Sequence, residues 1–412
     1  MWLCNAEKKE KMKEFLEKKE FNNINKQNAK YSIVDYLFAC FFAISIFNES
    51  LTLLFLSAYI LFVTFLFISN TRIYFIKINP YFVFSLLFIV VCYILHLNGN
   101  SIYPSASQNM LDRLFKKFLL MILVYYYFYT TKNINHIFDV IALSVVFFTI
   151  IVFILCLPTL FKVRLGDSIG VNSNALAYNA CIAAAFIYSR NLKSKKFADK
   201  LLLVFLFITV LFTGSRKGIF FFTFIIIFMF IFTKKSKKIA LYLIIALLLI
   251  GLMYMLIIKV PVFYNLIGYR VENIINLMKT GETDEASLLT RTNMIEVAWE
   301  KIEKNPLTGY GLDSFRNWNP NKIYSHNNYI ELLFSVGVIG IIFWYLPYLW
   351  IMLNCLYLIK KDRNDYTLIM ILGLVICILI LDYGLVSYYA NYVLILQLLM
   401  FTYISKKKVA IL

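Results

Sequence analysis

Charged residues are scarce in this chain of 412 amino acids: they make up 16% of it, against roughly 25% in a soluble protein. Apolar residues make up 61%, and the mean hydropathy is +0.73. So few charges and so much apolar surface exclude a soluble multidomain enzyme and a disordered chain. They predict a polytopic membrane protein whose surface mostly faces lipid.

Cysteine and histidine are also rare, with seven and three residues. Six cysteines lie within or at the ends of apolar runs, so no disulfide framework is predicted. The first 30 residues are polar, which argues against a cleavable signal peptide and leaves insertion to the first span. The net charge is +18. In a membrane protein such an excess of cations is typical of cytoplasmic helix ends, so we predict no nucleic-acid partner.

Apolar runs of nearly the length that crosses a bilayer, about 17–25 residues, recur along the chain. The candidate spans are 33–48, 51–69, 81–97, 114–130, 138–157, 174–190, 199–213, 217–233, 239–259, 330–357, 366–382 and 385–404. We therefore predict an all-α membrane protein with about 12 transmembrane helices and one long, partly helical outer loop.

The distribution of Lys and Arg predicts the orientation. With the N-terminus inside, the inner segments hold 26 of the 41 cations and the short outer loops hold 7. This asymmetry favours cytoplasmic N- and C-termini. The predicted organisation is a cytoplasmic N-terminal segment, nine spans, a large outer loop, three spans and a cytoplasmic tail. Their bounds are 1–32, 33–259, 260–329, 330–404 and 405–412.

Two adjacent cations, Arg216 and Lys217, lie in the turn between the seventh and eighth spans, on the predicted outer face. One interpretation is a tight helical hairpin with cations at the water line. The other is a phosphate site, because a guanidinium binds phosphate oxygens in a bidentate manner. Arg164, in the loop after the fifth span, is predicted on the same face.

The long outer loop contains a helical pattern from about Ser287 to Lys304, followed by the turn-forming segment 305–311. Ala298 and Ile302 fall on the same helical face as Arg291. An arginine on an apolar face needs a partner. Either a carboxylate of the loop forms a structural salt bridge with Arg291, or the loop covers an anion site.

His326 begins the tenth span, and Ser325 is the expected N-cap. A helix N-terminus disfavours the imidazolium form, so we expect a neutral His326 that can accept a proton. Asn327 and Asn328 share its first turn, and the free N–H groups there attract an anion. A purely structural histidine is the alternative. The outer loops contain no HExxH, CxxC or close carboxylate pair, so no metal and no other cofactor is predicted.

Three segments together resemble the O-antigen ligase and polymerase superfamily of bacterial membrane proteins. They are 211–218 (LFTGSRKG), 305–315 (NPLTGYGLDSF) and 326–340 (HNNYIELLFSVGVIG). The resemblance implies a GT-C-type fold and a metal-independent inverting glycosyltransferase. It places the functional arginines and histidine on Arg216, Arg291 and His326 and adds Arg164 as a contact, with Arg270 as an alternative to Arg291. From their positions we add Lys217, Asn327 and Asn328 to the substrate-binding set.

The superfamily transfers glycans from an undecaprenyl-diphosphate carrier on the outer face of the cytoplasmic membrane. The implied partners are this donor, a sugar hydroxyl on a glycan or lipid-linked acceptor, the bilayer, and chain-length regulator or flippase proteins. We favour a repeat-unit polymerase over a ligase that modifies lipid A-core. A flippase of lipid-linked glycans would instead line a central cavity with cations. A peptidoglycan-building GT-C enzyme would use an outer carboxylate, Asp313 or Glu331, as its base.

Overall fold

The computed structural model describes residues 31–46, 52–69, 77–233, 268–280, 286–320 and 322–411, with scattered positions between 244 and 264. Within these ranges all regular elements are helices, which agrees with the predicted all-α class. The helices are α2 (Ile33–Ser45), α3 (Thr52–Ser69), α4 (Pro80–Leu97), α5 (Pro104–Thr130), α6 (Ile134–Cys156), α7 (Ser173–Ser194), α8 (Phe197–Phe212), α9 (Arg216–Thr233), α12 (Tyr269–Thr280), α13 (Ala286–Ile302), α14 (Ser314–Trp318), α15 (Asn328–Lys361), α16 (Tyr366–Leu381) and α17 (Asn391–Ile411), with short 3-10 turns η2 (Leu157–Thr159) and η3 (Asp167–Ile169).

Every predicted span except the ninth coincides with a described helix. The ninth, 239–259, falls where only scattered positions are described and lies outside the described residues. Four described segments are long and apolar enough to cross a membrane: Pro80–Leu97, Ile134–Thr159, Arg216–Thr233 and Asn328–Lys361. Three apolar helices are shorter. The chain is thus an all-α polytopic membrane protein, and the count of about 12 spans stays a prediction.

Two predicted boundaries are wrong. Helix α5 begins at Pro104, ten residues before the predicted start of its span, because its first turns are polar and a hydropathy pattern does not detect them. Helix α17 begins at Asn391 instead of residue 385. The segment 382–390, named here the 382–390 loop, is non-helical although Val386 and Tyr388 are apolar and buried. Hydropathy alone cannot distinguish such a buried loop from a helix.

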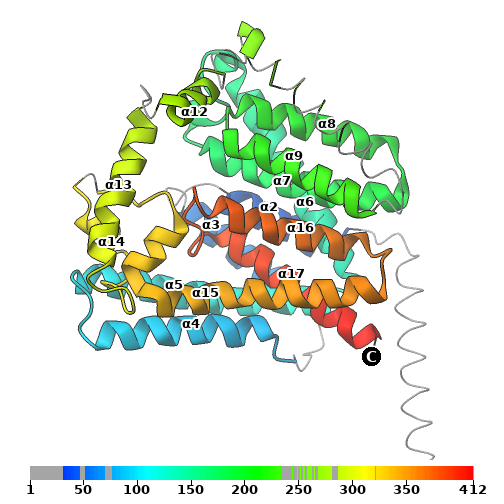
Figure 1. The fold of residues 1–412 in the computed structure, drawn as a ribbon. Helices are drawn as coiled ribbons and strands as arrows, with labels where there is room; N and C mark the ends of the chain where they lie inside the picture. The colour runs from blue at the N-terminus through cyan, green and yellow to red at the C-terminus, as the bar shows by residue number, and fades with distance from the viewer. Residues whose placement is uncertain are drawn as a thin grey trace, which may run out of the picture.

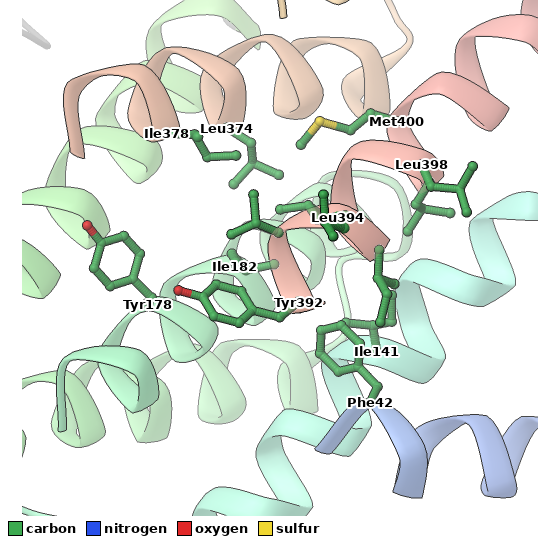
Figure 2. Close-up of a cluster of buried hydrophobic side chains, with 14 of the residues drawn as sticks. Phe42, Ile141, Tyr178, Ile182, Leu374, Ile378, Tyr392, Leu394, Leu398 and Met400 are labelled. Carbon is green, nitrogen blue, oxygen red and sulfur yellow. The ribbon is translucent and has the colours of Figure 1, made fainter. Parts of the chain in front are cut away.

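The helices pack into layers around a shared apolar core (Figure 1). Helix α7 contacts α6, α8, α9 and α16, while the long α15 lies along α4 and also contacts α16 and α17. Figure 2 shows side chains of five helices meeting at the centre, among them Phe42, Ile141, Ile182, Leu374 and Leu394. Each of these five side chains is at most 8% exposed. Because Ile182 belongs to this core, the core holds α7 in place, and the N-terminal end of α7 lines the candidate site.

Helix α15 is interrupted at Gly337, whose φ of 63° and ψ of −167° are not helical. The preceding loop segment, residues 306–311, runs against the break and pairs with the backbone groups that the interruption frees. The bonds are Tyr310 N–H to Phe334 O (2.8 Å), Gly311 N–H to Ser335 O (2.7 Å), Val338 N–H to Pro306 O (2.9 Å) and Ile339 N–H to Leu307 O (3.3 Å). We call this pairing the 306–311 junction.

The predicted helix of segment 260–329 is present as α13, and the described half of its predicted apolar face is buried. Ala298 and Ile302 lie in a small cluster with Phe315 and Phe334. This cluster and the 306–311 junction attach α13 and the chain after it to the first half of α15 and therefore support the segment that begins with His326.

Candidate functional site

A cavity of about 130 Å³ lies where the N-terminal ends of α7, α9 and α15 meet. The 382–390 loop closes another side. The lining residues are Arg164, Asn172, Asn174, Ala175, Tyr178, Gly214, Ser215, Arg216, Lys217, Tyr324, His326, Gly384 and Leu385. The structure therefore brings together four predicted site residues from three distant parts of the sequence.

Arg216 and Lys217 form the first turn of α9. Ser215 caps this helix, since its hydroxyl accepts a hydrogen bond from Gly218 N–H at 3.2 Å. Gly218 lets α9 approach α7 closely, because a Cβ there would lie 2.7 Å from the Cβ of Ala177. The segment 213–218 is therefore a capped and tightly packed turn that presents two adjacent cations to the cavity.

Arg164 connects two walls of the cavity. Its Nε donates to the carbonyl of Thr213 at 2.7 Å, and its Nη2 donates to Oδ1 of Asn174 at 3.0 Å. Asn174 lies in the first turn of α7, and Asn172 caps that helix. These two acceptors are neutral groups, and the guanidinium of Arg164 lines the cavity.

Lys217 reaches across the cavity and donates a hydrogen bond to the carbonyl of Gly384 in the 382–390 loop. The approach is close, because a Cβ on Gly384 would displace the end of the Lys217 side chain. The ammonium group thus connects α9 to the 382–390 loop at the edge of the cavity.

His326 precedes α15 instead of beginning it. Its φ is 57°, in the left-handed region, and the N-cap is Asn327, whose Oδ1 accepts from the N–H groups of Tyr329 and Ile330. The predicted N-cap, Ser325, is therefore wrong. Its hydroxyl binds Asn327 instead, and its N–H donates to Glu331 at 2.9 Å. The left-handed turn directs His326 into the cavity beside Tyr324, with ring centroids 4.4 Å apart.

The cavity is strongly positive. Arg164, Arg216 and Lys217 line it, and no carboxylate is among the described residues that do. Three helices also begin at the cavity, and each N-terminus carries a partial positive charge, although side-chain caps bind some of its N–H groups. Side-chain charge and helix dipoles therefore act in the same direction, and the arrangement favours an anion.

The other predicted site residues are placed differently. Asn327 and Asn328 are buried and do not line the cavity; Asn327 caps α15, and Asn328 binds the 382–390 loop. The side chains of Arg270 and Arg291 lie outside the described part of the structure, although α12 and α13 include both positions. All these assignments stay predictions. Within the described ranges, no group of three or more His, Cys, Asp or Glu residues could hold a metal ion.

Sequence reasoning missed part of the wall. Tyr178 looks like one apolar residue among many in α7, Leu385 is the first residue of a predicted span, and Gly384 falls in the short turn before that span. The pair Asn172 and Asn174 could have been found, since Asn before a helix is a common cap.

Comparison with known proteins adds one match. The model of the O-antigen ligase family matches residues 201–345, a range that includes Arg216, Arg291 and His326 but not Arg164. No curated protein matches the chain. The match supports the resemblance that the sequence motifs indicate: residues 201–345 of this chain are similar to the O-antigen ligase family.

Proposed function

We propose that the protein is a membrane glycosyltransferase that moves an undecaprenyl-diphosphate-linked oligosaccharide onto a sugar hydroxyl of an acceptor. The observation that carries this proposal is the cavity with three cations, a histidine and no carboxylate in its described lining. Such a site suits a diphosphate, which brings negative charge that the protein must offset. The match to the O-antigen ligase family supports the same class of reaction.

In the proposed reaction the acceptor hydroxyl attacks the anomeric carbon of the donor sugar from the face opposite the diphosphate. A new C–O bond forms, the bond to the diphosphate breaks, and the lipid diphosphate leaves with the electron pair. His326 accepts the hydroxyl proton or orients the hydroxyl. Attack from the opposite face inverts the anomeric configuration.

Arg216 and Arg291 offset the charge that grows on the leaving diphosphate, so the protein's own cations take the role that a metal ion has elsewhere. Arg164 and Lys217 add positive charge at the cavity wall. Arg270 remains the alternative to Arg291. We keep Asn327 in the proposed substrate-binding set. Asn328 belongs to the proposed site without a direct substrate contact, because its side-chain hydrogen bonds are to the protein itself.

We place this site on the outer face of the bacterial cytoplasmic membrane, with both termini inside and a GT-C-like arrangement of about 12 spans. The five segments proposed from the sequence, 1–32, 33–259, 260–329, 330–404 and 405–412, keep their bounds. Chain-length regulator or flippase proteins are the proposed protein partners.

The flippase hypothesis predicts cations along a central passage. A second cavity, of about 440 Å³, does contain Arg190 and Lys193, but at the opposite end of α7. Between the two cavities α7 has the segment 182–185, in which each residue is at most 3% exposed. This packing favours the transferase over a flippase. The peptidoglycan hypothesis needs an outer carboxylate as base, whereas Glu331 is 1% exposed and accepts from Ser325.

The test is the glycan profile of a deletion strain that carries the wild type, Arg216→Lys, or the matched control Arg316→Lys. Arg316 lies on the outer loop away from the cavity and pairs with Asp313. We expect Arg216→Lys to lower transfer by roughly 10²-fold, because lysine lacks the bidentate fork. Wild-type transfer by Arg216→Lys, with equal membrane expression, removes the phosphate-binding role of Arg216.

The same profiles distinguish the two transfer reactions. A polymerase is indicated if the deletion leaves single repeat units and the wild type restores long chains. A ligase is indicated if long chains persist on the carrier but never reach their acceptor. An unchanged profile in the deletion strain contradicts the glycosyltransferase proposal and favours a transporter.

A further inference from the structure

Asn328 is buried and all hydrogen-bonding positions of its side-chain amide are occupied. Oδ1 accepts from the N–H groups of Ser387 at 3.0 Å and Tyr388 at 3.3 Å. Nδ2 donates to the hydroxyl of Tyr345 at 2.9 Å and to Oδ2 of Asp382 at 3.2 Å. Such a fully bonded amide holds its surroundings in one arrangement.

The partners of Asn328 belong to two different elements. Tyr345 lies on α15 itself, 17 residues after Asn328. The other three partners, Asp382, Ser387 and Tyr388, belong to the 382–390 loop. The backbone strengthens the connection, because Asn328 N–H donates to the carbonyl of Asp382 at 2.7 Å. Asn328 therefore joins the start of α15 to this loop.

Both joined parts carry a wall of the positive cavity. His326 lies two residues before Asn328, and the loop presents Gly384 and Leu385 to the cavity. Gly384 in turn accepts from Lys217 on α9, and farther along the loop Tyr389 accepts from Lys117 on α5. The Tyr345 hydroxyl also donates to Asp382 of the loop at 2.7 Å. Lys217, Lys117, Tyr345 and Asn328 thus all hold the loop, and Asn328 is the one of these four nearest to His326 in the sequence.

We propose that Asn328 is a positioning residue: it sets the separation between His326 and the loop that anchors Lys217, and so keeps the cavity walls in register for the diphosphate. The inference rests on the proposed function, because it assigns Asn328 a role in that same site. It differs from the prediction that Asn328 contacts substrate, since the side chain has no donor or acceptor left for a ligand.

The first experiment measures the loop directly and needs no enzymatic activity. Leu385→Cys places a thiol on the cavity wall in a cysteine-free background, and its rate of maleimide labelling reports the position of the loop. We expect Asn328→Ala to raise this rate by roughly tenfold, because the side-chain hydrogen bonds that hold the loop are lost while the backbone bond from residue 328 to Asp382 remains. Tyr345→Phe removes the acceptor of one Asn328 hydrogen bond and also the hydrogen bond that the Tyr345 hydroxyl donates to Asp382 at 2.7 Å, and it gives a smaller rise because the other three side-chain bonds of Asn328 remain.

The matched control is Asn354→Ala. Asn354 also lies on α15, but its Nδ2 donates to the carbonyl of Trp350 within the same helix. We expect Asn354→Ala to change the labelling rate by less than about twofold. Equal labelling in the Asn328→Ala, Tyr345→Phe and parent proteins overturns the positioning role, and the Tyr345→Phe arm keeps this test open if Asn328→Ala does not fold.

The second experiment is a double-mutant cycle on glycan transfer. If Asn328 acts through the Lys217 anchor, Asn328→Ala lowers transfer less in a Lys217→Met background than in the wild type, by at least about threefold. If Asn328 contributes only to overall stability, Asn328→Ala lowers glycan transfer by the same factor in both backgrounds. We expect the control Asn354→Ala to behave in this additive way. If the wild type transfers no glycan, the proposed function fails, and the labelling experiment still decides whether Asn328 positions the loop.

Discussion

At the scale of the residue, the backbone of His326 determines which variant tests its chemistry. Its φ of 57° is a conformation that Asn adopts more readily than most residues. We expect His326→Asn to keep the free energy of unfolding within about 1 kcal/mol of the wild type. Glycan transfer should fall by roughly 10²–10⁴-fold if the imidazole is a general base. Unfolding in detergent and the glycan profile measure the two effects.

A β-branched control clarifies the result. His326→Val removes the same imidazole but also strains the left-handed turn, so it should be less stable than His326→Asn by about 1–2 kcal/mol. If His326→Asn transfers glycan at the wild-type rate, His326 is not the base, and its role at the cavity is structural.

The site residues were predictable from the sequence to different degrees. Arg216 and His326 lie in motifs with recognisable neighbours, and both line the cavity. Gly384 could not be predicted, because its importance depends on the approach of Lys217, which is 167 positions away along the chain. A motif shows which residues are unusual, whereas a contact of this kind exists only after folding.

At the scale of the element, the 306–311 junction explains two glycines that the sequence motifs contain. Gly309 and Gly337 lie back to back: a Cβ on Gly309 would lie 2.6 Å from the carbonyl carbon of Ser335, and one on Gly337 would collide with Leu307. Both also have φ above 60°. Only glycine permits this close pairing of a loop with the interruption in α15.

We therefore expect Gly309→Ala and Gly337→Ala each to lower the free energy of unfolding by about 1–3 kcal/mol through overpacking, beyond the cost of the positive φ. Gly99→Ala is the matched control, because Gly99 has a φ of 73° but no neighbour within 4 Å of an added Cβ. The double variant should lose less than the sum, since both changes disrupt one junction. Equal losses in all three single variants contradict the steric argument.

The helices themselves were largely predictable, because long apolar runs require helices in a bilayer. The polar first turns of α5 and the non-helical 382–390 loop could not be predicted in this way. Hydropathy depends on composition and contains no information on hydrogen bonding. The α15 interruption lies inside an apolar run, and only the partner segment 306–311 makes it stable.

At the scale of the whole molecule, the orientation in the membrane decides which cavity meets a substrate outside the cell. The two cavities lie at opposite ends of α7, so only one can face outward if α7 crosses the membrane. The excess of Lys and Arg in the predicted inner segments predicts that the positive cavity with Arg216 and His326 faces outward.

Cysteine labelling of intact cells tests this orientation. Lys162 and Lys196 are both exposed and lie beyond opposite ends of α7. In a cysteine-free background, Lys162→Cys should react with a membrane-impermeant maleimide in intact cells, and Lys196→Cys only after permeabilisation. The control for exposure is labelling in permeabilised cells, where the thiols at positions 162 and 196 should react equally. The reverse labelling pattern would place the positive cavity on the cytoplasmic side. A glycan that has already been moved to the outer face cannot reach a site there. The proposed transfer reaction would then be wrong, even if Arg216 and His326 proved essential.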